Sequence, residues 1–207
     1  AMNSNHVQRF TLAQRLVHWV VGLSFTLLLL TGFAFSYPAL FWLTVLVGGG
    51  PSARVLHPWI GVVFTASLVW MFALWVKDMF ITGADKHWLR SIQHYALHTR
   101  DKIPPAGKYN GGQKIFFWVQ SVLGVVLVIT GLPLWFPDGI LGFGSPSSLM
   151  LSTMRAGHYL CALGGGLLLI VHVYLGLVAF PGTARGMIDG KVSQQWAELH
   201  HPLWKRK

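Results

Sequence analysis

The hydrophobic pattern divides the chain into four long apolar runs separated by polar connections. The runs cover residues 16–35, 55–76, 115–136 and 157–180, and none of them contains Asp, Glu, Lys or Arg. A helix needs about 20 apolar residues to cross roughly 30 Å of hydrocarbon, and each run reaches that length. The pattern therefore predicts an all-α integral membrane protein, with one domain over residues 1–207 built as a four-helix bundle.

A fifth apolar stretch, residues 40–47, is too short to cross a bilayer. It ends in Gly48, Gly49, Gly50 and Pro51, residues that are typical of a turn. We expect an interfacial or re-entrant piece here. The first long run exceeds the apolar core of a signal peptide and no clear small-x-small cleavage site follows it, so we expect it to be a retained span.

The composition changes this picture by adding a strong positive charge. Hydrophobic residues make up 53% of the 207 residues, and 16 Lys and Arg against 6 Asp and Glu give a formal net charge of +10. In a soluble chain such an excess would suggest a nucleic-acid partner. In a multi-spanning chain, basic loops are instead an orientation signal, so we expect no nucleic acid. The single cysteine, Cys161, excludes an internal disulfide or a Cys-rich metal site within this chain.

Fourteen of the sixteen basic residues fall on one side of the predicted spans. The positive-inside rule places that side in the cytoplasm, together with both termini and the connection over residues 77–114. Only Arg54 and Arg155 fall on the outer side. We therefore expect a multi-pass membrane protein.

Four histidines lie inside the predicted spans: His18, His57, His158 and His172. An ionisable group in a span is costly and is therefore a candidate functional residue. His57 and His158 each begin a span at the outer side, whereas His18 lies near the cytoplasmic side. His172 lies fourteen positions after His158, about 21 Å deeper and about 40° short of four full helical turns. The topology thus predicts an outer pair, His57 with His158, and an inner pair, His18 with His172.

Such a pair could be hydrogen bonded, relay protons, bind a small metal ion or supply the two axial ligands of a haem. Small residues follow each histidine by four positions, at Gly22, Gly61, Ala162 and Gly176, with Gly165 one turn beyond Ala162. A flat macrocycle against a helix needs a missing side chain there, although small residues also let membrane helices pack closely. This spacing favours two haems. Iron held by two imidazoles has no open position for a substrate, so we expect electron transfer rather than bond chemistry.

Two local expectations concern the remaining histidines and Pro58. Proline pushes the preceding residue away from helical angles, so we expect His57 to lie at the start of its helix. We expect the histidines outside the spans to be surface or partner contacts, among them His6, His87, His200 and His201.

The chain resembles the cytochrome b (gamma) subunit of membrane-bound respiratory formate dehydrogenase. The resemblance runs from Arg9 to Trp204. Its motifs are residues 15–19 (RLVHW), 56–61 (LHPWIG), 108–114 (KYNGGQK), 157–159 (GHY), 171–174 (VHVY) and 200–204 (HHPLW). The KYNGGQK segment together with the closing HHPLW is the most specific part, although Asn-Gly ahead of a helix can also be a plain turn.

The resemblance implies that the four histidines ligate two b haems in the pairs given above. It also implies a quinone, menaquinone or ubiquinone, bound on the cytoplasmic side near Asn110, Gly112, Gln113 and His172. Amide side chains and free backbone N–H groups are suitable neutral donors to a quinone carbonyl. No catalytic residue for formate is implied in this chain.

The implied partners are an iron–sulphur (beta) subunit and a molybdenum- or tungsten-pterin catalytic (alpha) subunit, and a higher oligomer of the complex is compatible with the resemblance. Two other readings stay open. Cytochrome b subunits of nickel–iron hydrogenase and of thiosulphate reductase share the dihaem plan. A metal or proton transporter would use the histidines as relay sites, although no predicted span carries a carboxylate.

Overall fold

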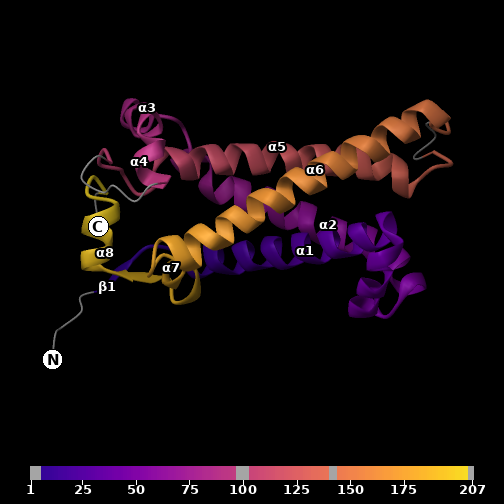
Figure 1. Ribbon diagram of the computed structural model, residues 1–207, viewed down its shortest axis with the longest axis horizontal. Helices are drawn as coiled ribbons and strands as arrows, with labels where there is room; N and C mark the ends of the chain where they lie inside the picture. Colours follow the sequence, from indigo (N-terminus) through magenta and orange to yellow (C-terminus); the bar gives the residue numbers. More distant parts are fainter. Residues whose placement is uncertain (1–5, 97–102, 140–143, 205–207) are drawn as a thin grey trace. The chain divides into compact units, whose positions relative to one another are not determined.

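The structure, a computed structural model, describes residues 6–96, 103–139 and 144–204. These residues fall into two compact units. Unit 1 contains the described parts of Ala1–Leu16, Phe72–Val119 and Val171–Lys207, and unit 2 contains those of Val17–Met71 and Gln120–Ile170. Four long helices, labelled in Figure 1, each contribute residues to both units.

The four long helices are α1 (Leu12–Ser36), α2 (Gly50–Trp75), α5 (Gly111–Trp135) and α6 (Ser148–Tyr174). Short helical turns extend two of them, η2 (Val76–Asp78) after α2 and η4 (Leu175–Ala179) after α6. All four are long and apolar enough to cross a membrane, with mean hydropathy between 1.9 and 2.2 in their most apolar windows. The predicted all-α membrane fold is thus confirmed.

Large apolar side chains cover the outside of these helices. Leu23 is 61% exposed, Val69 65% and Ile170 67%. On a water-soluble protein such a surface would drive association. Against lipid tails it costs nothing, because the tails are as apolar as the side chains.

Helix α2 begins earlier than the sequence predicts, and the expectation that His57 starts it is wrong. The helix starts at Gly50 and contains Pro58 in its interior. Pro51 occupies the first turn, where the missing N–H costs nothing. Within a membrane bundle an interior proline is tolerated, because neighbouring groups satisfy the freed carbonyl.

The short apolar stretch forms a 3-10 helix, η1 (Pro38–Val47). It is too short to cross a bilayer, as the sequence predicts. Gly48 and Gly49 end it with φ angles of 89° and 93°. Only glycine adopts that left-handed region readily, so the glycine run permits the sharp passage from η1 into α2.

The core of unit 2 is built by segments of all four long helices. Phe25 of α1, Phe64 and Leu68 of α2, and Leu127 of α5 form a buried cluster against which Ala162 of α6 packs. Phe25 and Phe64 have ring centres 5.7 Å apart. In lipid, close packing of this kind replaces the hydrophobic effect as the source of helix association.

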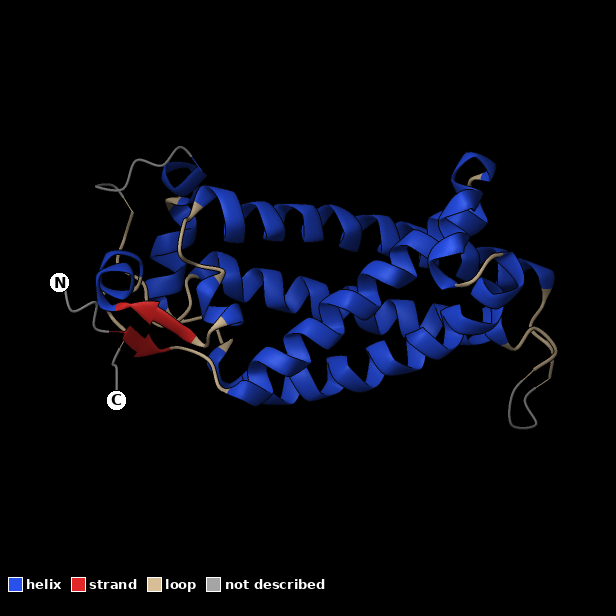
Figure 2. Ribbon diagram, turned by 90° about the horizontal axis from the view of Figure 1, so that it is seen from below, coloured by secondary structure: helices blue, strands red, loops and turns tan. Residues whose placement is uncertain are grey.

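Unit 1 contains the short elements of the chain. They are β1 (His6–Gln8), α3 (Gly83–Arg90), α4 (Ile92–Ala96), α7 (Arg185–Ile188), β2 (Lys191–Ser193) and α8 (Gln194–His200). The two strands pair antiparallel, with His6 opposite Ser193, and are the red arrows of Figure 2. This pairing joins the N-terminal and C-terminal segments of the described chain.

Basic residues are distributed unevenly between the units. Among the described residues, unit 2 contains only Arg54 and Arg155, and all other Lys and Arg belong to unit 1. Arg100, Lys102, Lys205, Arg206 and Lys207 lie outside the described residues. Unit 1 therefore gathers the described parts of the three segments that the charge pattern assigns to one side of the membrane.

Candidate functional site

Two of the four candidate ligands, His57 of α2 and His158 of α6, lie close together in unit 2. Their ring centres are 6.5 Å apart and their planes are inclined by 60°. Metal–imidazole bonds are about 2 Å long and the ring centre lies about one ångström further, so two imidazoles across one metal atom have centres about 6 Å apart. The separation of this pair fits an iron atom between the rings.

Each of these two rings also contacts a threonine on a neighbouring helix. The Oγ1 atom of Thr31, on α1, is 2.7 Å from Nδ1 of His57. The Oγ1 atom of Thr130, on α5, is 2.9 Å from Nδ1 of His158. The sequence analysis did not single out either threonine, because a hydroxyl in a span is ordinarily satisfied by its own helix.

Open space lies beside three of the predicted small residues. A Cβ built at Gly22, Gly61 or Gly176 would meet no atom within 4 Å. Gly61 follows His57 by one helical turn, so the space lies on the face that carries the ligand. These positions fit the edge of a flat macrocycle.

The small residues that follow His158 have a different role. Ala162 packs against the buried cluster that contains Phe25. A Cβ at Gly165 would lie 2.9 Å from Cζ of Phe25. The expectation that Gly165 leaves room for a ring is therefore wrong, since this glycine brings α6 close to α1.

The two candidate inner ligands belong to different units, His18 to unit 2 and His172 to unit 1. His18 lies edge-on to Trp19, with ring centres 5.5 Å apart. His172 stacks on Phe116 of α5, with ring centres 4.9 Å apart and planes inclined by 13°. The π turn η4 begins soon after, at Leu175. Such turns occur frequently at functional sites.

The candidate quinone residues form the N-terminal cap of α5. The backbone N–H of Gln113 donates to Oδ1 of Asn110 at 2.9 Å, and the backbone N–H of Asn110 donates to Oε1 of Gln113 at 3.0 Å. This is a reciprocal capping box. A Cβ at Gly112 would lie 3.0 Å from the ring of Trp88. The lack of a side chain at Gly112 therefore lets α3 pack closely against the start of α5. The cap uses the amide oxygens of both side chains, and their NH₂ groups are the donors that remain.

Lys114, the residue after Gln113, forms a buried ion pair that was not predicted from the sequence. Nζ of Lys114 lies 2.7 Å from Oδ2 of Asp85, which also accepts from the backbone N–H and the hydroxyl of Thr82. Burial disfavours the charged carboxylate, but the hydrogen bonds from Lys114 and Thr82 outweigh it and hold the pKa of Asp85 below its usual value. The Thr82-x-x-Asp85 spacing is a capping signal that could have located the carboxylate.

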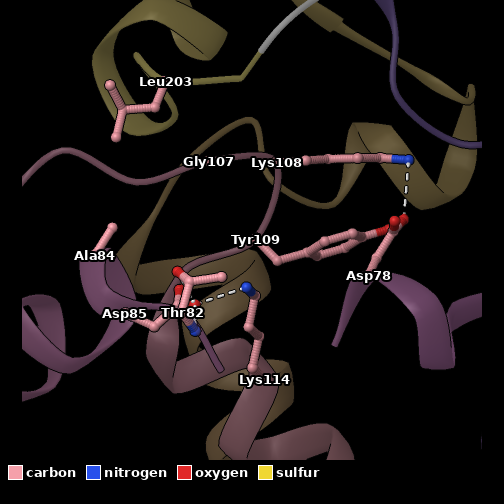
Figure 3. A pocket seen from close by; sticks show the side chains of 9 residues that line it. All are labelled: Asp78, Thr82, Ala84, Asp85, Gly107, Lys108, Tyr109, Lys114 and Leu203. Carbon is pink, nitrogen blue, oxygen red and sulfur yellow. Dashed lines mark hydrogen bonds and ion pairs between the residues drawn. The ribbon is translucent and has the colours of Figure 1, made fainter. Parts of the chain in front are cut away.

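The ion pair lines a cavity of about 280 Å³ in unit 1. Figure 3 shows Lys114 reaching Asp85 on one side and Lys108 reaching Asp78 on the other, with Tyr109 between them. Burial lowers the pKa of Lys108 and raises that of Tyr109. The remaining lining residues are Thr82, Ala84, Gly107 and Leu203. Several titratable groups therefore line the cavity.

His201 is buried, so the expectation of a surface position for it is wrong. It is 2% exposed, and its Nδ1 lies 2.6 Å from the carbonyl oxygen of Gly107 while Nε2 lies 3.1 Å from Nη2 of Arg9. A carbonyl accepts and a guanidinium donates, so the ring is protonated at Nδ1 only. Burial, together with the charge of Arg9, lowers the pKa of His201 to about 3.

Comparisons with known proteins agree with these features. A family model described as prokaryotic cytochrome b561 matches residues 9–190. The chain is 33% identical, over 99% of its length and 92% of the relative, to the cytochrome b556(Fdn) subunit of nitrate-inducible formate dehydrogenase of Escherichia coli K12.

Two further relatives have similar names. Identity is 32% over 97% of the chain and 92% of the relative for the formate dehydrogenase cytochrome b556(fdo) subunit of Escherichia coli K12. It is 27% over 99% of the chain and 84% of the relative for the formate dehydrogenase cytochrome b556 subunit of Haemophilus influenzae. The resemblance drawn from the motifs is thereby confirmed, and the chain belongs to the prokaryotic cytochrome b561 family.

Proposed function

We propose that this chain is the membrane-anchoring dihaem cytochrome b subunit of a respiratory formate dehydrogenase. It would pass electrons from an iron–sulphur subunit on the periplasmic side to a quinone reduced near the cytoplasmic face. The observation that carries the proposal is the 6.5 Å separation of the His57 and His158 rings inside a bundle of spanning helices. The relatives named as formate dehydrogenase cytochrome subunits support the choice of complex.

The four span histidines hold two b haems in this proposal, His57 with His158 and His18 with His172. When bound, haem iron with two axial imidazoles supplies one-electron transfer. The ligands and the surrounding apolar helices set the reduction potential and exclude water. The open space beside Gly61 supports the outer position, and that beside Gly22 and Gly176 supports the inner one.

In the proposed orientation, the basic residues of unit 1 face the cytoplasm. The concentration of described Lys and Arg in unit 1 supports this, because basic loops stay cytoplasmic. Both termini and the connection over residues 77–114 are then cytoplasmic, and the protein lies in the bacterial inner membrane. The iron–sulphur and pterin subunits dock from the opposite side.

The quinone lies near the start of α5 in the proposal. Asn110 and Gln113 present amide NH₂ donors there, and Gly112 lies between them against the ring of Trp88. Gln113 precedes Phe116 by one turn, and Phe116 stacks on His172. The titratable cavity around Asp85 and Lys114 opens from the same helix terminus, where protons for the quinone would enter.

The test is a reduced-minus-oxidised spectrum and a pyridine haemochrome assay on the purified chain. We expect two b haems per chain. A chain without haem b would refute the proposal in full. Purification of the native complex then separates two of the donors: a pterin-containing subunit favours formate dehydrogenase over hydrogenase, and a nickel-containing one indicates a hydrogenase subunit instead.

A further inference from the structure

The same dipeptide, Thr-Gly, stands beside each histidine of the outer pair. Thr31 and Gly32 on α1 contact His57 of α2, and Thr130 and Gly131 on α5 contact His158 of α6. In both cases the threonine hydroxyl meets Nδ1 of the ring. In both cases the glycine lies under Cε1, where an added Cβ would be 3.8 Å away at Gly32 and 3.2 Å away at Gly131. The helix pairs α1–α2 and α5–α6 thus repeat one arrangement around the two histidines.

The hydroxyl hydrogens of both threonines are already committed to the backbone. Oγ1 of Thr31 donates to the carbonyl oxygen of Leu27 at 2.8 Å. Oγ1 of Thr130 donates to the carbonyl oxygen of Val126 at 2.7 Å. A hydroxyl has one hydrogen and two lone pairs, so each oxygen can only accept from the histidine.

The consequence for the histidines is a fixed tautomer. Nδ1 of His57 and of His158 carries the proton and donates it to threonine. Nε2 is then left with a free lone pair, which is the form that binds a metal. The threonines are nearly inaccessible, Thr31 at 1% and Thr130 at 6% exposed, so water does not compete for these bonds.

We propose that Thr31 and Thr130 are a matched pair of positioning residues for the outer haem. They hold both axial imidazoles in the Nδ1–H tautomer, fix the rotation of each ring and set the basicity of each ligand. Gly131 leaves room for the close approach of the His158 ring, whereas at Gly32 a Cβ would make only an ordinary contact with the His57 ring. The inference rests on the proposed function, since it concerns how the outer haem is held.

An acceptor on Nδ1–H makes the opposite nitrogen a stronger donor to the metal. A more basic ligand favours the oxidised iron, so these bonds lower the reduction potential of the outer haem. Replacement by valine keeps the shape of threonine and removes the hydroxyl acceptor. Replacement by serine keeps the hydroxyl and gives the rescue variant.

The experiment uses the full haem-loaded chain in detergent, with the variants Thr31→Val, Thr130→Val, their combination, and Thr31→Ser with Thr130→Ser. Redox titration of the haem absorbance gives the potential of each haem, and electron paramagnetic resonance reports the angle between the two imidazole planes. The matched control is Thr26→Val on α1, whose hydroxyl donates to the carbonyl oxygen of Gly22 at 2.7 Å.

We expect each valine variant to raise the potential of the outer haem, to change its resonance spectrum and to weaken its binding about tenfold or more. The serine variants and Thr26→Val should keep the outer haem as in the unmodified chain. Loss of the outer haem in the valine variants but not in the serine variants supports the proposal as well. An unchanged outer potential and spectrum in the double valine variant would overturn it, and so would equal losses in serine and valine variants. An unmodified chain without any haem would instead refute the proposed function.

Discussion

Lys114 and Asp85 form a buried ion pair that joins the first turn of α5 to α3, with Nζ and Oδ2 2.7 Å apart. Both side chains are nearly inaccessible, at 9% and 6% exposure. Nζ of Lys114 also donates to the carbonyl oxygen of Phe80 at 3.0 Å. The pair therefore anchors α3 at the helix terminus that carries the candidate quinone residues.

Breaking one side of this pair should destabilise the docking of α3. Lys114→Met leaves the carboxylate of Asp85 buried without its cation, and removing one partner of a buried pair typically costs about 3–5 kcal/mol. The double variant Lys114→Met with Asp85→Asn should lose less than the two single variants together. Thermal unfolding in detergent, with hydrogen exchange over α3, measures both effects.

The control for that prediction is the exposed pair of Arg185 and Asp189, whose side chains are 63% and 47% exposed. An exposed pair is worth about 0–1 kcal/mol, so Arg185→Ala should have little effect. Equal losses for Arg185→Ala and Lys114→Met would contradict the role of burial.

The lowered pKa of Asp85 adds a pH dependence to the ion pair. The stabilisation that the ionised carboxylate contributes is present above pH about 4 and is lost as the pH falls below that value.

The C-terminal segment should loosen in mild acid because of His201. Its pKa is about 3 in the fold against about 6.5 when unfolded. Below pH 6.5 the unfolded segment binds a proton that the folded one excludes. The docking free energy should therefore be full above pH 6.5 and decline toward pH 3, by up to about 1.4 kcal/mol per pH unit.

Hydrogen exchange over α8 as a function of pH tests this. The variant His201→Asn should flatten the pH profile between 6.5 and 3, although it weakens docking at neutral pH. The exposed His87 is the control, and His87→Asn should leave the profile unchanged. A profile that keeps its shape in His201→Asn would assign the acid sensitivity to another group.

Single alanine variants of the four span histidines should group by haem. His57→Ala and His158→Ala should each remove the same haem, which we expect to be the outer one. His18→Ala and His172→Ala should each remove the other. Redox titration of the haem that is retained in each variant identifies the group, and any other grouping would refute the pairing.

Asn110 offers a way to separate its capping role from quinone binding. Asn110→Asp keeps the oxygen that accepts from Gln113 but removes the NH₂ donor, whereas Asn110→Ala removes both. Loss of the cap in the alanine variant should cost about 0.5–2 kcal/mol of stability. Both variants should slow quinone reduction, with both haem spectra nearly unchanged.

The rates are measured with a soluble quinone analogue on the prereduced complex. If Asn110→Asp reduces quinone at the rate of the unmodified protein, the amide of Asn110 is only a cap. Gln113→Glu tests the second amide in the same manner, because it keeps the acceptor for the N–H of Asn110.

The spanning helices could be predicted from sequence because a single physical requirement, about 20 residues without charge, determines them. The start of α2 could not. Gly48 caps the end of η1, while Gly50 and Pro51 already begin α2, and glycine and proline give the same turn signal in both positions. The candidate ligands could also be found from the sequence, because ionisable residues are rare in membrane spans.

The hydrogen bonds around those candidate ligands could not be predicted from the sequence. Thr31 and Thr130 lie 26 and 28 positions from the rings that they contact. The burial of His201 depends on Arg9, which is 192 positions away. No local sequence pattern predicts such contacts, because they form only when the helices pack together.

The pairing of β1 with β2 has a consequence for biogenesis. His6 can find its partner Ser193 only after the residues between them have been synthesised. Contacts between such distant positions form late, because a long loop must close before they contribute any free energy. Strand β1 therefore stays unpaired until the four long helices have been synthesised. A chain that ends before residue 191 would lack β2 and so leave β1 without its partner strand.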